Sequence, residues 1–339
     1  MDGVERECQR DGSMGRKVSS WRWVLRDDID DDRWNRVVLS DERSLPYGLT
    51  EVLDARAKQW GGLVRNDYEA VCPIPYRRIA GCVNISRMPL GLQQLGLFYA
   101  PSCRLNRETH PVDEWSELYS ALDALPENFI WLDLHFHEGL PLIKPEGLWW
   151  KSGPWGWMRC WNRQNAVLHL ENEYQLNFEC FSEQTRRNVK KAQNAHLELF
   201  EHDSPEVLIH AFEQHQVKRY GAMPNDFLKS VRWQMHALIH QRKGMVHTVY
   251  GPGNEFLAGA FWWFQGDRVV LYFSTATDAG RELQAMSYLI NEVVLQASGT
   301  WRRLDFEGSQ APGLFRFYLG WGAQPKPYLR VQRFRIPFP

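Results

Sequence analysis

The chain has no apolar run long enough to cross a membrane as a helix. Its longest apolar stretch, Leu257 to Phe264, has the length of a strand, whereas a spanning helix needs about 20 such residues. Residues 1–20 are polar and charged and lack the apolar core of a secretory signal. We therefore expect no membrane insertion, a cytoplasmic protein, and a disordered tail over residues 1–20.

Cysteine is scarce and scattered. The six cysteines of the 339 residues include no Cys-x-x-Cys pair, which argues against a zinc site. Such spacing is typical of reduced thiols in a cytosolic protein. His135 and His137 alternate on an expected strand, but no third ligand follows at a recognisable spacing. We expect no metal.

Charge of one sign is also missing, because the formal net charge is −1. No global field attracts nucleic acid or an anionic membrane, so phosphate binding would depend on local patches. The sequence contains no Gly-x-Ser-x-Gly elbow and no Walker loop, which argues against a hydrolase of that type and against an NTPase.

Tryptophan, in contrast, is abundant, with sixteen residues. Five of them lie between Leu148 and Trp161 among several helix and strand breakers. We predict a loop or linker there, at a seam between two halves of the chain. Its tryptophans would pack between domains or shape a groove for an apolar acyl chain, and the first alternative is favoured.

Hydrophobic periodicity predicts alternating strands and helices in the first half of the chain. The expected helices cover 49–60, ended by Gly61-Gly62, and 115–125. The expected strands are 21–26, 68–74, 82–85 and 129–136. The chain is long for a single hydrophobic core and suits two domains.

The second half has a clearer pattern of strand, two helices, three strands, helix, strand, helix and strand. The expected helices are 205–220, 227–242, 282–297 and one that begins at Pro312 and ends before Gly320. The expected strands are 196–201, 245–250, 256–264, 268–275, 304–306 and 328–336. This predicts a mixed α/β protein of two similar units, 21–165 and 166–339, whose last strand packs back on the first unit.

Three segments resemble the FemAB-like branch of the GNAT acyltransferases, which carry two GNAT domains in tandem. Residues 181–192 (FSEQTRRNVKKA) resemble that family's segment of a serine followed by a basic helix. Residues 271–275 (LYFST) resemble its aromatic strand before the pyrophosphate loop. Residues 304–308 (LDFEG), with 317–322 (FYLGWG), resemble its Asp-Phe-x-Gly strand and the helix after it.

This resemblance implies two tandem GNAT-like domains and transfer of an acyl or aminoacyl group to an amine. Founding members of the family take amino acids from aminoacyl-tRNA. The order of elements is that of the GNAT fold, whose other members use acyl-CoA. Residues 276–285 lack the glycine-spaced loop that cradles the CoA pyrophosphate, which leaves acyl-CoA, aminoacyl-tRNA and a carrier protein open as donors.

The candidate catalytic residues follow the strand 304–306. Asp305 and Glu307 are two residues apart, so on a strand they would face one side, where either could orient or deprotonate an amine. The alternative is that Asp305 is a structural partner of Arg302, of Arg303 or of a helix N-terminus. Tyr318 stands where GNAT enzymes often carry the tyrosine that protonates the leaving group, and it would equally fit a hydrophobic core.

The candidate binding residues lie on the preceding strand and helix. Tyr272 and Ser274 would share one strand face and line the acceptor cleft; alternatively, Tyr272 forms a cross-strand aromatic pair with Phe261 or Trp263. Backbone N–H groups near Ala285, at the start of the expected helix 282–297, would bind an anion of the cofactor with the help of Arg281.

A basic helix follows Ser182, its expected N-cap. Arg186 and Lys190 lie four residues apart on this helix, as do Arg187 and Lys191. These two stripes would bind phosphates of a nucleotide-linked substrate or a tRNA end, unless they form only a solvated helix face.

Together these observations predict an N-acyltransferase that acts on a small-molecule or peptide amine by direct attack on a thioester or ester. An aminoacyl-tRNA-dependent, peptide-bond-forming ligase and a non-catalytic GNAT-fold binding protein are the alternatives. The sequence names neither the donor nor the acceptor.

Overall fold

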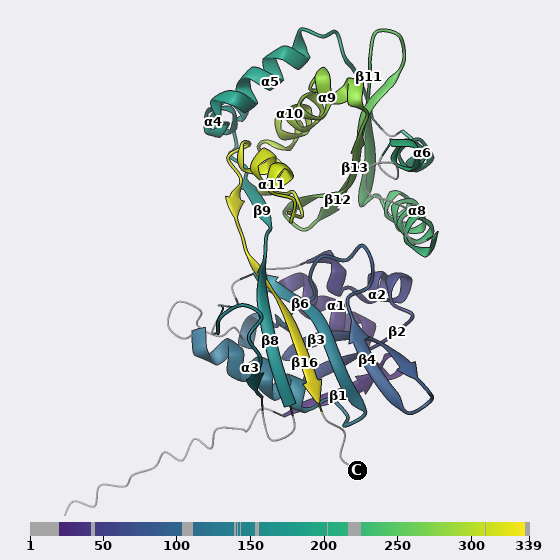
Figure 1. Cartoon of the computed structure of the whole chain (residues 1–339), viewed down its shortest axis with the longest axis vertical. Helices are drawn as coiled ribbons and strands as arrows, with labels where there is room; N and C mark the ends of the chain where they lie inside the picture. The colour runs from purple at the N-terminus through teal and green to yellow at the C-terminus, as the bar shows by residue number, and fades with distance from the viewer. Residues whose placement is uncertain are drawn as a thin grey trace, which may run out of the picture.

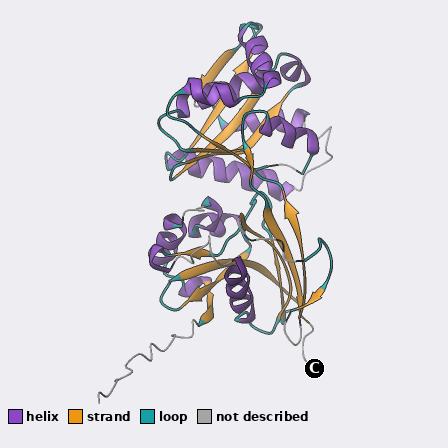
Figure 2. Cartoon of the chain, turned by 90° about the vertical axis from the view of Figure 1, so that its left-hand side faces the viewer, coloured by secondary structure: helices purple, strands orange, loops and turns teal. Residues whose placement is uncertain are grey.

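The computed structural model describes residues 20–41, 45–103, 111–138, 140, 142, 144–152, 156–201, 203–215, 225–308 and 310–335. The part of the chain so described forms two mixed β-sheets, one in each lobe of Figure 1. Helices lie on either side of the upper sheet, as Figure 2 shows. The tail predicted for 1–20 falls, except for Ser20, outside these residues. The mixed α/β class with two GNAT-like units is confirmed.

The first sheet has the strand order β1-β2-β3-β4-β6-β16-β8-β7, and β5 pairs with β3. Its strands are β1 (Trp21–Leu25), β2 (Gln59–Arg65), β3 (Ala70–Ile79), β4 (Val83–Arg87), β5 (Phe98–Tyr99), β6 (Phe129–Glu138), β7 (Trp150–Lys151), β8 (Gly156–Arg163) and β16 (Tyr328–Arg335). The helices of this lobe are α1 (Asp31–Ser40), α2 (Thr50–Arg56) and α3 (Pro111–Asp123).

The second sheet has the strand order β10-β11-β12-β13-β14-β9-β15. Its strands are β9 (Ala166–His169), β10 (Glu198–Glu201), β11 (Gly244–Tyr250), β12 (Phe256–Gln265), β13 (Arg268–Ala276), β14 (Arg303–Asp305) and β15 (Gln324–Pro325). Its helices are α4 (Tyr174–Cys180), α5 (Glu183–Gln193), α6 (Pro205–His215), α8 (Asn225–His240), α9 (Asp278–Glu282), α10 (Ala285–Ala297) and α11 (Pro312–Leu319).

The chain passes between the two sheets at two neighbouring places. It leaves the first sheet from β8 and enters the second at β9, and it returns from β15 to β16. In Figure 1 the yellow β16 accordingly runs down from the upper lobe between β6 and β8. The last strand therefore belongs to the first sheet, where it pairs antiparallel with both neighbours.

The two faces of the second sheet contribute to different hydrophobic clusters. Trp262 and Leu271 belong to the cluster that contains α10 residues. Trp263 and Tyr272 instead join the cluster that contains the core of the first sheet, and the rings of Tyr47 and Trp263 meet edge to face at 5.6 Å. This face of the second sheet is thus packed against the first lobe.

Two local predictions fail in the first half. Gly61 and Gly62 do not end a helix but lie inside β2, and the helix ends at Arg56. A Cβ at Gly62 would collide with the Trp34 ring, so this glycine serves the close approach of an indole to the sheet. The glycine pair fits a helix end in sequence, but the packing gives it another role.

The tryptophan-rich segment 148–161 is also no linker, because it forms β7 and most of β8. Trp149 and Trp161 lie on either side of the Arg159 guanidinium, at 4.3 and 4.7 Å from its carbon. The Trp150 indole donates a hydrogen bond of 3.0 Å to the Tyr119 hydroxyl. These contacts hold the segment on the first sheet, although its breakers suggested a loop.

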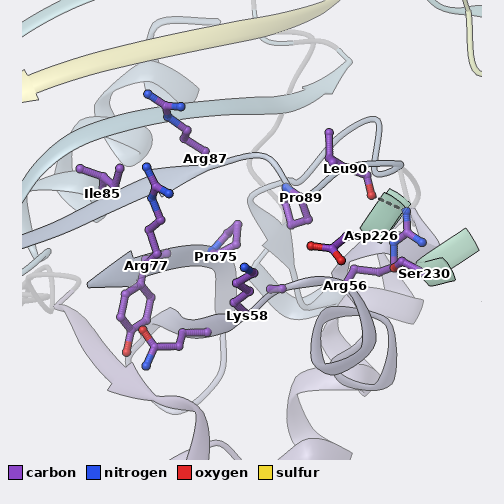
Figure 3. Close-up of a pocket in the computed structure, with 13 residues that line it drawn as sticks. Arg56, Lys58, Pro75, Arg77, Ile85, Arg87, Pro89, Leu90, Asp226 and Ser230 are labelled. Carbon is purple, nitrogen blue, oxygen red and sulfur yellow. Dashed lines mark hydrogen bonds between the residues drawn. The ribbon is translucent and has the colours of Figure 1, made fainter. Parts of the chain in front are cut away.

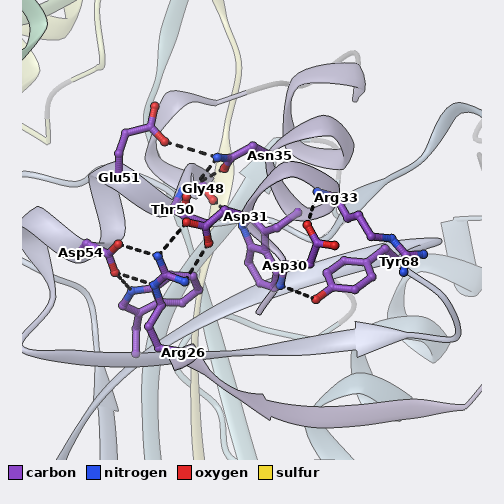
Figure 4. A network of polar contacts seen from close by, with 12 residues as sticks. Arg26, Asp30, Asp31, Arg33, Asn35, Gly48, Thr50, Glu51, Asp54 and Tyr68 are labelled. Carbon is purple, nitrogen blue, oxygen red and sulfur yellow. Dashed lines mark hydrogen bonds and ion pairs between the residues drawn. The ribbon is translucent and has the colours of Figure 1, made fainter. Parts of the chain in front are cut away.

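A polar network fixes α2 on this lobe (Figure 4). Arg26 binds both carboxyl oxygens of Asp54 at 2.7 Å, and Trp60 Nε1 donates to Asp54 at 2.7 Å. The hydrogen bonds from Arg26 hold the pKa of Asp54 below its usual value. Since Asp54 precedes the end of α2 by two residues, the network also positions Arg56.

Candidate functional site

β13 and β14 part from each other in the middle of the second sheet. They pair in parallel only from Arg268–Arg303 to Val270–Asp305, and β13 then continues to Ala276. Beyond Val270, the described residues show no strand hydrogen-bonded to that edge of β13. Its backbone N–H and C=O groups on this side are therefore available to bind a carbonyl group or an extended substrate.

A β-bulge interrupts β13 at Tyr272. Phe261 pairs with Phe273 and Trp262 pairs with Leu271, so Tyr272 is an extra residue on its strand. Tyr272 and Phe273 consequently lie in the same hydrophobic cluster although they are consecutive. Ser274 alternates with Phe273, so the bulge removes the shared face that simple alternation predicts for Tyr272 and Ser274.

Tyr272 does form the aromatic pairs that were the alternative to substrate binding. Its ring meets Phe261 at 6.0 Å and Trp263 at 5.7 Å, both edge to face. Its buried hydroxyl has no hydrogen-bond partner among the described residues. Burial raises the pKa of Tyr272, and the charge of Arg56 acts in the opposite direction.

Asp305 is held in a buried ion pair. Arg268 Nη1 donates to Asp305 Oδ2, and both side chains are only 2% exposed. Asp305 Oδ1 accepts from the Glu307 backbone N–H at 2.9 Å. This geometry favours a structural role for Asp305 over a catalytic one. Its partner is Arg268 rather than Arg302 or Arg303.

Glu307 does not share a strand face with Asp305, because β14 ends at Asp305 and Glu307 has a left-handed backbone, with φ 55°. The Glu307 carboxyl oxygen Oε1 is buried without a hydrogen-bond partner among the described residues. Burial raises the pKa of this carboxyl well above its usual value. A raised pKa makes the ionised carboxylate a stronger base, a property that suits a general base.

Tyr318 lies on α11 beside this turn, and its ring stacks on Phe306 at 4.7 Å between centroids. Burial raises its pKa, and the nearby Glu307 acts in the same direction. The structure thus brings Glu307 and Tyr318 together behind the end of β14. Ser309, the next polar residue of this turn, is outside the described residues.

The anion site expected at the start of helix 282–297 is arranged differently. Two helices, α9 and α10, replace the one predicted, and Gln284 breaks them with φ 61°. Arg281 is on α9 and pairs with Asp278, whereas Ala285 is the first residue of α10 and is fully buried. The first N–H groups of α10 remain a place where an anion could bind, but Arg281 is engaged by its own helix.

The basic helix is α5, and Ser182 is its N-cap, since its hydroxyl accepts from the Thr185 N–H at 3.2 Å. Arg186 donates to the Glu179 carbonyl at 3.1 Å. Arg187 is 3.4 Å from Glu183 in an exposed ion pair. Lys190 and Lys191 are exposed on the last turn. This face is more solvated and less uniformly positive than the sequence suggested.

A cavity of about 430 Å³ lies between the first sheet and α8 (Figure 3). Four cationic side chains line it, from the end of α2 and from β3 and β4, against one acidic side chain from α8. These are Arg56, Lys58, Arg77, Arg87 and, as the acid, Asp226. The cavity therefore favours an anionic guest.

Arg56 is the buried member of this set, at 9% exposed. Its Nη2 donates to the Leu90 carbonyl, while Nε and Nη1 have no hydrogen-bond partner among the described residues. Burial lowers the pKa of Arg56, although an arginine keeps its proton in proteins. A buried charge without a counterion is costly, so an anionic ligand group would complete this arrangement.

The loop of residues 90–93 passes close to the Arg56 side chain. Gly91 has φ +78°, and a Cβ there would collide with Arg56 Nη2. Only glycine combines this backbone conformation with so close an approach. On the other side of the same loop, the Gln93 amide donates to the Glu307 carbonyl oxygen. Residues 90–93 thus connect the cationic cavity with the Glu307 turn.

Sequence reasoning missed the cationic cavity. Its arginines come from three separate elements, and none of them lies in a motif. The pair Arg77-Arg78 and the glycine after Leu90 were visible, but neither indicates which side chains are buried. Tertiary packing alone brings Arg56 beside Arg77 and Arg87.

Two further properties concern the described residues only. They contain no group of three His, Cys, Asp or Glu side chains placed to hold a metal ion. None of their helices is both long and apolar enough to cross a bilayer.

Known proteins resemble this chain in one sequence segment and in the overall fold. Residues 181–317 match the family model described as an acetyltransferase (GNAT) domain. A search of curated proteins gave no match. The crystal structure of FemX is similar at 11% identity over 91% of this chain and 96% of that one, with a TM-score of 0.61.

Two other solved structures are similar at comparable identity. A conserved protein of unknown function from Bacteroides thetaiotaomicron VPI-5482 matches at 10% identity over 91% of this chain and 98% of that one, with a TM-score of 0.51. A tandem GNAT protein from the clavulanic acid biosynthesis pathway matches at 11% identity over 95% and 99%, with a TM-score of 0.48. The chain therefore shares the fold of FemX over most of its length, and residues 181–317 match a GNAT acetyltransferase domain.

Proposed function

We propose that the chain is an N-acyltransferase that moves an acyl or aminoacyl group from a thioester or ester donor to the amine of an acceptor. We further propose that the acceptor carries an anionic group, such as a phosphate or a carboxylate, and that the cationic cavity holds this group. The observation that carries the proposal is Arg56, a buried guanidinium whose Nε and Nη1 lack partners among the described residues. The GNAT family match supports the reaction class.

The reaction would take place where β13 leaves β14. The neutral amine attacks the donor carbonyl carbon, a C–N bond forms, and the C–S or C–O bond to the leaving group breaks. Backbone N–H groups near Phe273 to Thr275 would stabilise the oxyanion. Glu307 would take the proton from the amine, and Tyr318 would protonate the leaving group. No covalent intermediate on the protein is needed.

Asp305 has a positioning role in this scheme. Its carboxylate is held by Arg268 and accepts the Glu307 N–H, so it orients the turn that presents Glu307. Tyr272 would contribute its buried hydroxyl, on which the charge of Arg56 acts. Ser274, on the other face of β13, has no part in this scheme.

The donor is the open part of the proposal. The N–H groups of α10 beside Ala285, with Arg281 near them, would hold the phosphates of an acyl-CoA. Arg186 and Lys190 of α5 would instead favour the phosphates of a tRNA. A strong decrease of transfer with salt, and its loss in an Arg186/Lys190 double alanine variant, would support the tRNA.

The test separates binding from catalysis. Isothermal titration with pyrophosphate should show saturable binding to the parent protein and none to Arg56→Met. Two sugars, glucosamine 6-phosphate and glucosamine, serve as matched probe amines with and without an anionic group. With acetyl-CoA or aminoacyl-tRNA as donor, mass spectrometry should show more acylation of the phosphorylated probe. Pyrophosphate binding without any product, across donors and acceptors, would favour a non-catalytic GNAT-fold binding protein. Transfer that does not distinguish the two sugars, with no pyrophosphate binding, would refute the role of the cavity.

A further inference from the structure

Gln93 reaches from the first lobe to the turn that carries Glu307 in the second. Its side-chain amide donates to the Glu307 carbonyl oxygen and, over a longer distance of 3.4 Å, to Asn165 Oδ1. Its side-chain oxygen accepts from Gln94 Nε2 at 2.7 Å. Its backbone carbonyl accepts from His135 Nδ1 at 2.8 Å. The side chain and the backbone of Gln93 are therefore both held in place.

The first lobe holds this part of the chain without help from the Gln93 side chain. The Leu95 N–H donates to the His135 carbonyl oxygen at 2.7 Å, and the His135 ring binds the Gln93 backbone. Both contacts attach the segment to β6, which contains His135. A substitution at Gln93 can therefore remove the amide and leave the backbone of the loop where it is.

The second lobe presents Glu307 in a backbone conformation that needs support. Glu307 and Gly308 both have positive φ, at 55° and 54°, which is unfavourable for a residue with a side chain. A Cβ at Gly308 would collide with the Gln164 carbonyl oxygen, so the turn packs directly on the segment that links the two sheets. Asp305 accepts the Glu307 N–H at 2.9 Å, and Gln93 donates to its carbonyl. The turn is thus held from both lobes.

The loop that ends at Gln93 also contacts the cationic cavity, because the Leu90 carbonyl accepts from Arg56 Nη2. Arg56 is the proposed binding group for the anion of the acceptor, and Glu307 is the proposed base. Gln93 is the third residue after Leu90, and three residues extend over at most about 10 Å. The loop therefore limits the separation of two groups that one acceptor molecule has to reach.

We propose that Gln93 is a positioning residue of the transfer reaction. Its amide holds the Glu307 turn where the carboxyl can reach the amine of an acceptor whose anionic group is bound at Arg56. This inference rests on the proposed function. A misplacement of about 1 Å can lower a rate roughly 100-fold, so the loss of this amide should affect kcat and not the binding of the acceptor.

The test compares two glutamine substitutions. Gln93→Met keeps the length of the side chain and removes the donor. Gln332→Met is the matched control, because Gln332 is a buried glutamine of the first sheet whose Nε2 donates to Asp133 at 2.7 Å. Should Gln93→Met fail to fold, Gln93→Leu takes its place.

With glucosamine 6-phosphate as the probe acceptor, Gln93→Met should lower kcat roughly 10- to 100-fold and leave KM for this sugar within about twofold. It should also bind pyrophosphate as the parent does, because Arg56 keeps its contact with Leu90. Gln332→Met should lower the urea midpoint at least as much and retain the kcat of the parent.

A second measurement does not depend on transfer. The Glu307 carboxyl is titrated by ¹³C NMR, and its signal is identified by its absence in Glu307→Gln. The ionisable groups near this carboxyl are Asp305, Tyr318 and Tyr328, and both glutamine variants retain them. Release of the turn should expose the carboxyl to water, so its raised pKa should move toward the ordinary value in the Gln93 variant and stay raised in the control.

A folded Gln93→Met with the kcat or the Glu307 titration of the parent would overturn the role of Gln93 and leave the proposed function intact. Equal losses of kcat in Gln93→Met and Gln332→Met would also overturn it, because they would reflect stability alone. A parent protein that acylates no acceptor would instead refute the proposed function, and this role of Gln93 with it.

Discussion

Arg56 and Arg268 are both buried arginines, yet their replacement by methionine should change stability in opposite directions. Arg268 faces the Asp305 carboxylate, at 2% exposure for each side chain. Arg56 has only the Leu90 carbonyl as acceptor and two nitrogens without partners among the described residues. Methionine keeps much of the length of either side chain and removes the charge.

The magnitudes follow from these contacts. Each unpartnered buried polar atom costs about 1–3 kcal/mol, so the two nitrogens of Arg56 cost roughly 2–6 kcal/mol in the ligand-free protein. Loss of the hydrogen bond to Leu90 offsets about 1 kcal/mol of this. Arg56→Met should therefore stabilise the ligand-free protein by about 1–5 kcal/mol. Arg268→Met leaves Asp305 buried without its cation and should destabilise it by about 3–5 kcal/mol.

The same Arg56 substitution should weaken anion binding. A bound anion would accept from Nε and Nη1, and hydrogen bonds to charged groups are worth about 1.5–3 kcal/mol each. A loss of about 3 kcal/mol corresponds to a roughly 100-fold higher dissociation constant for pyrophosphate. Greater stability together with weaker binding is the signature of a residue kept for its ligand.

The assay is urea denaturation of dialysed protein, followed by the fluorescence of its sixteen tryptophans, with pyrophosphate titration in parallel. A decrease in stability for Arg56→Met comparable to that for Arg268→Met would refute the reasoning, because it would mean that the Arg56 charge is already compensated.

Three further predictions concern the residues around this site. Burial raises the pKa of Glu307 well above 4.5, so the folded protein keeps a proton that the unfolded chain loses, and stability should fall as pH rises from about 4.5 toward the folded value. Glu307→Gln should remove this slope and abolish transfer. An unchanged pH dependence of unfolding would contradict a raised pKa for Glu307. Gly91→Ala should raise the dissociation constant of pyrophosphate, because the added Cβ displaces Arg56. Gly81→Ala is the control: Gly81 has a similar φ of +73° with open space around it, so this variant should lose about 1–2 kcal/mol of stability and bind pyrophosphate as the parent does. Equal binding by both variants would show that Arg56 tolerates the clash. Ser182→Ala should cost about 1 kcal/mol of stability through the lost α5 cap, measured by the urea midpoint, and a neutral result would mean that the N-cap hydrogen bond is replaced by water.

Local sequence patterns predicted the structure best where a segment carries a single signal, such as hydrophobic periodicity or a helix cap. The strands β11, β12 and β13 alternate or run apolar without interruption, and their bounds agree with prediction to within a residue or two. The Ser182 cap was readable because a hydroxyl before a helix has one main use. Prediction failed where two rules compete, as at Gly61-Gly62, where a helix-ending pair instead makes room for the Trp34 ring.

At the site, the sequence by itself determined which residues follow the central strand of the second domain, so Glu307 and Tyr318 could each be named as candidates. It also determined the family resemblance, because short motifs in a fixed order carry it. Only the tertiary structure decided that Asp305 is neutralised by Arg268 and that a bulge moves Tyr272 off the face of Ser274. It also decided that Arg56 is buried with two nitrogens that have no hydrogen-bond partner among the described residues. The physical reason is that burial and ion pairing depend on residues far apart in the chain, whereas propensity and periodicity extend only a few residues.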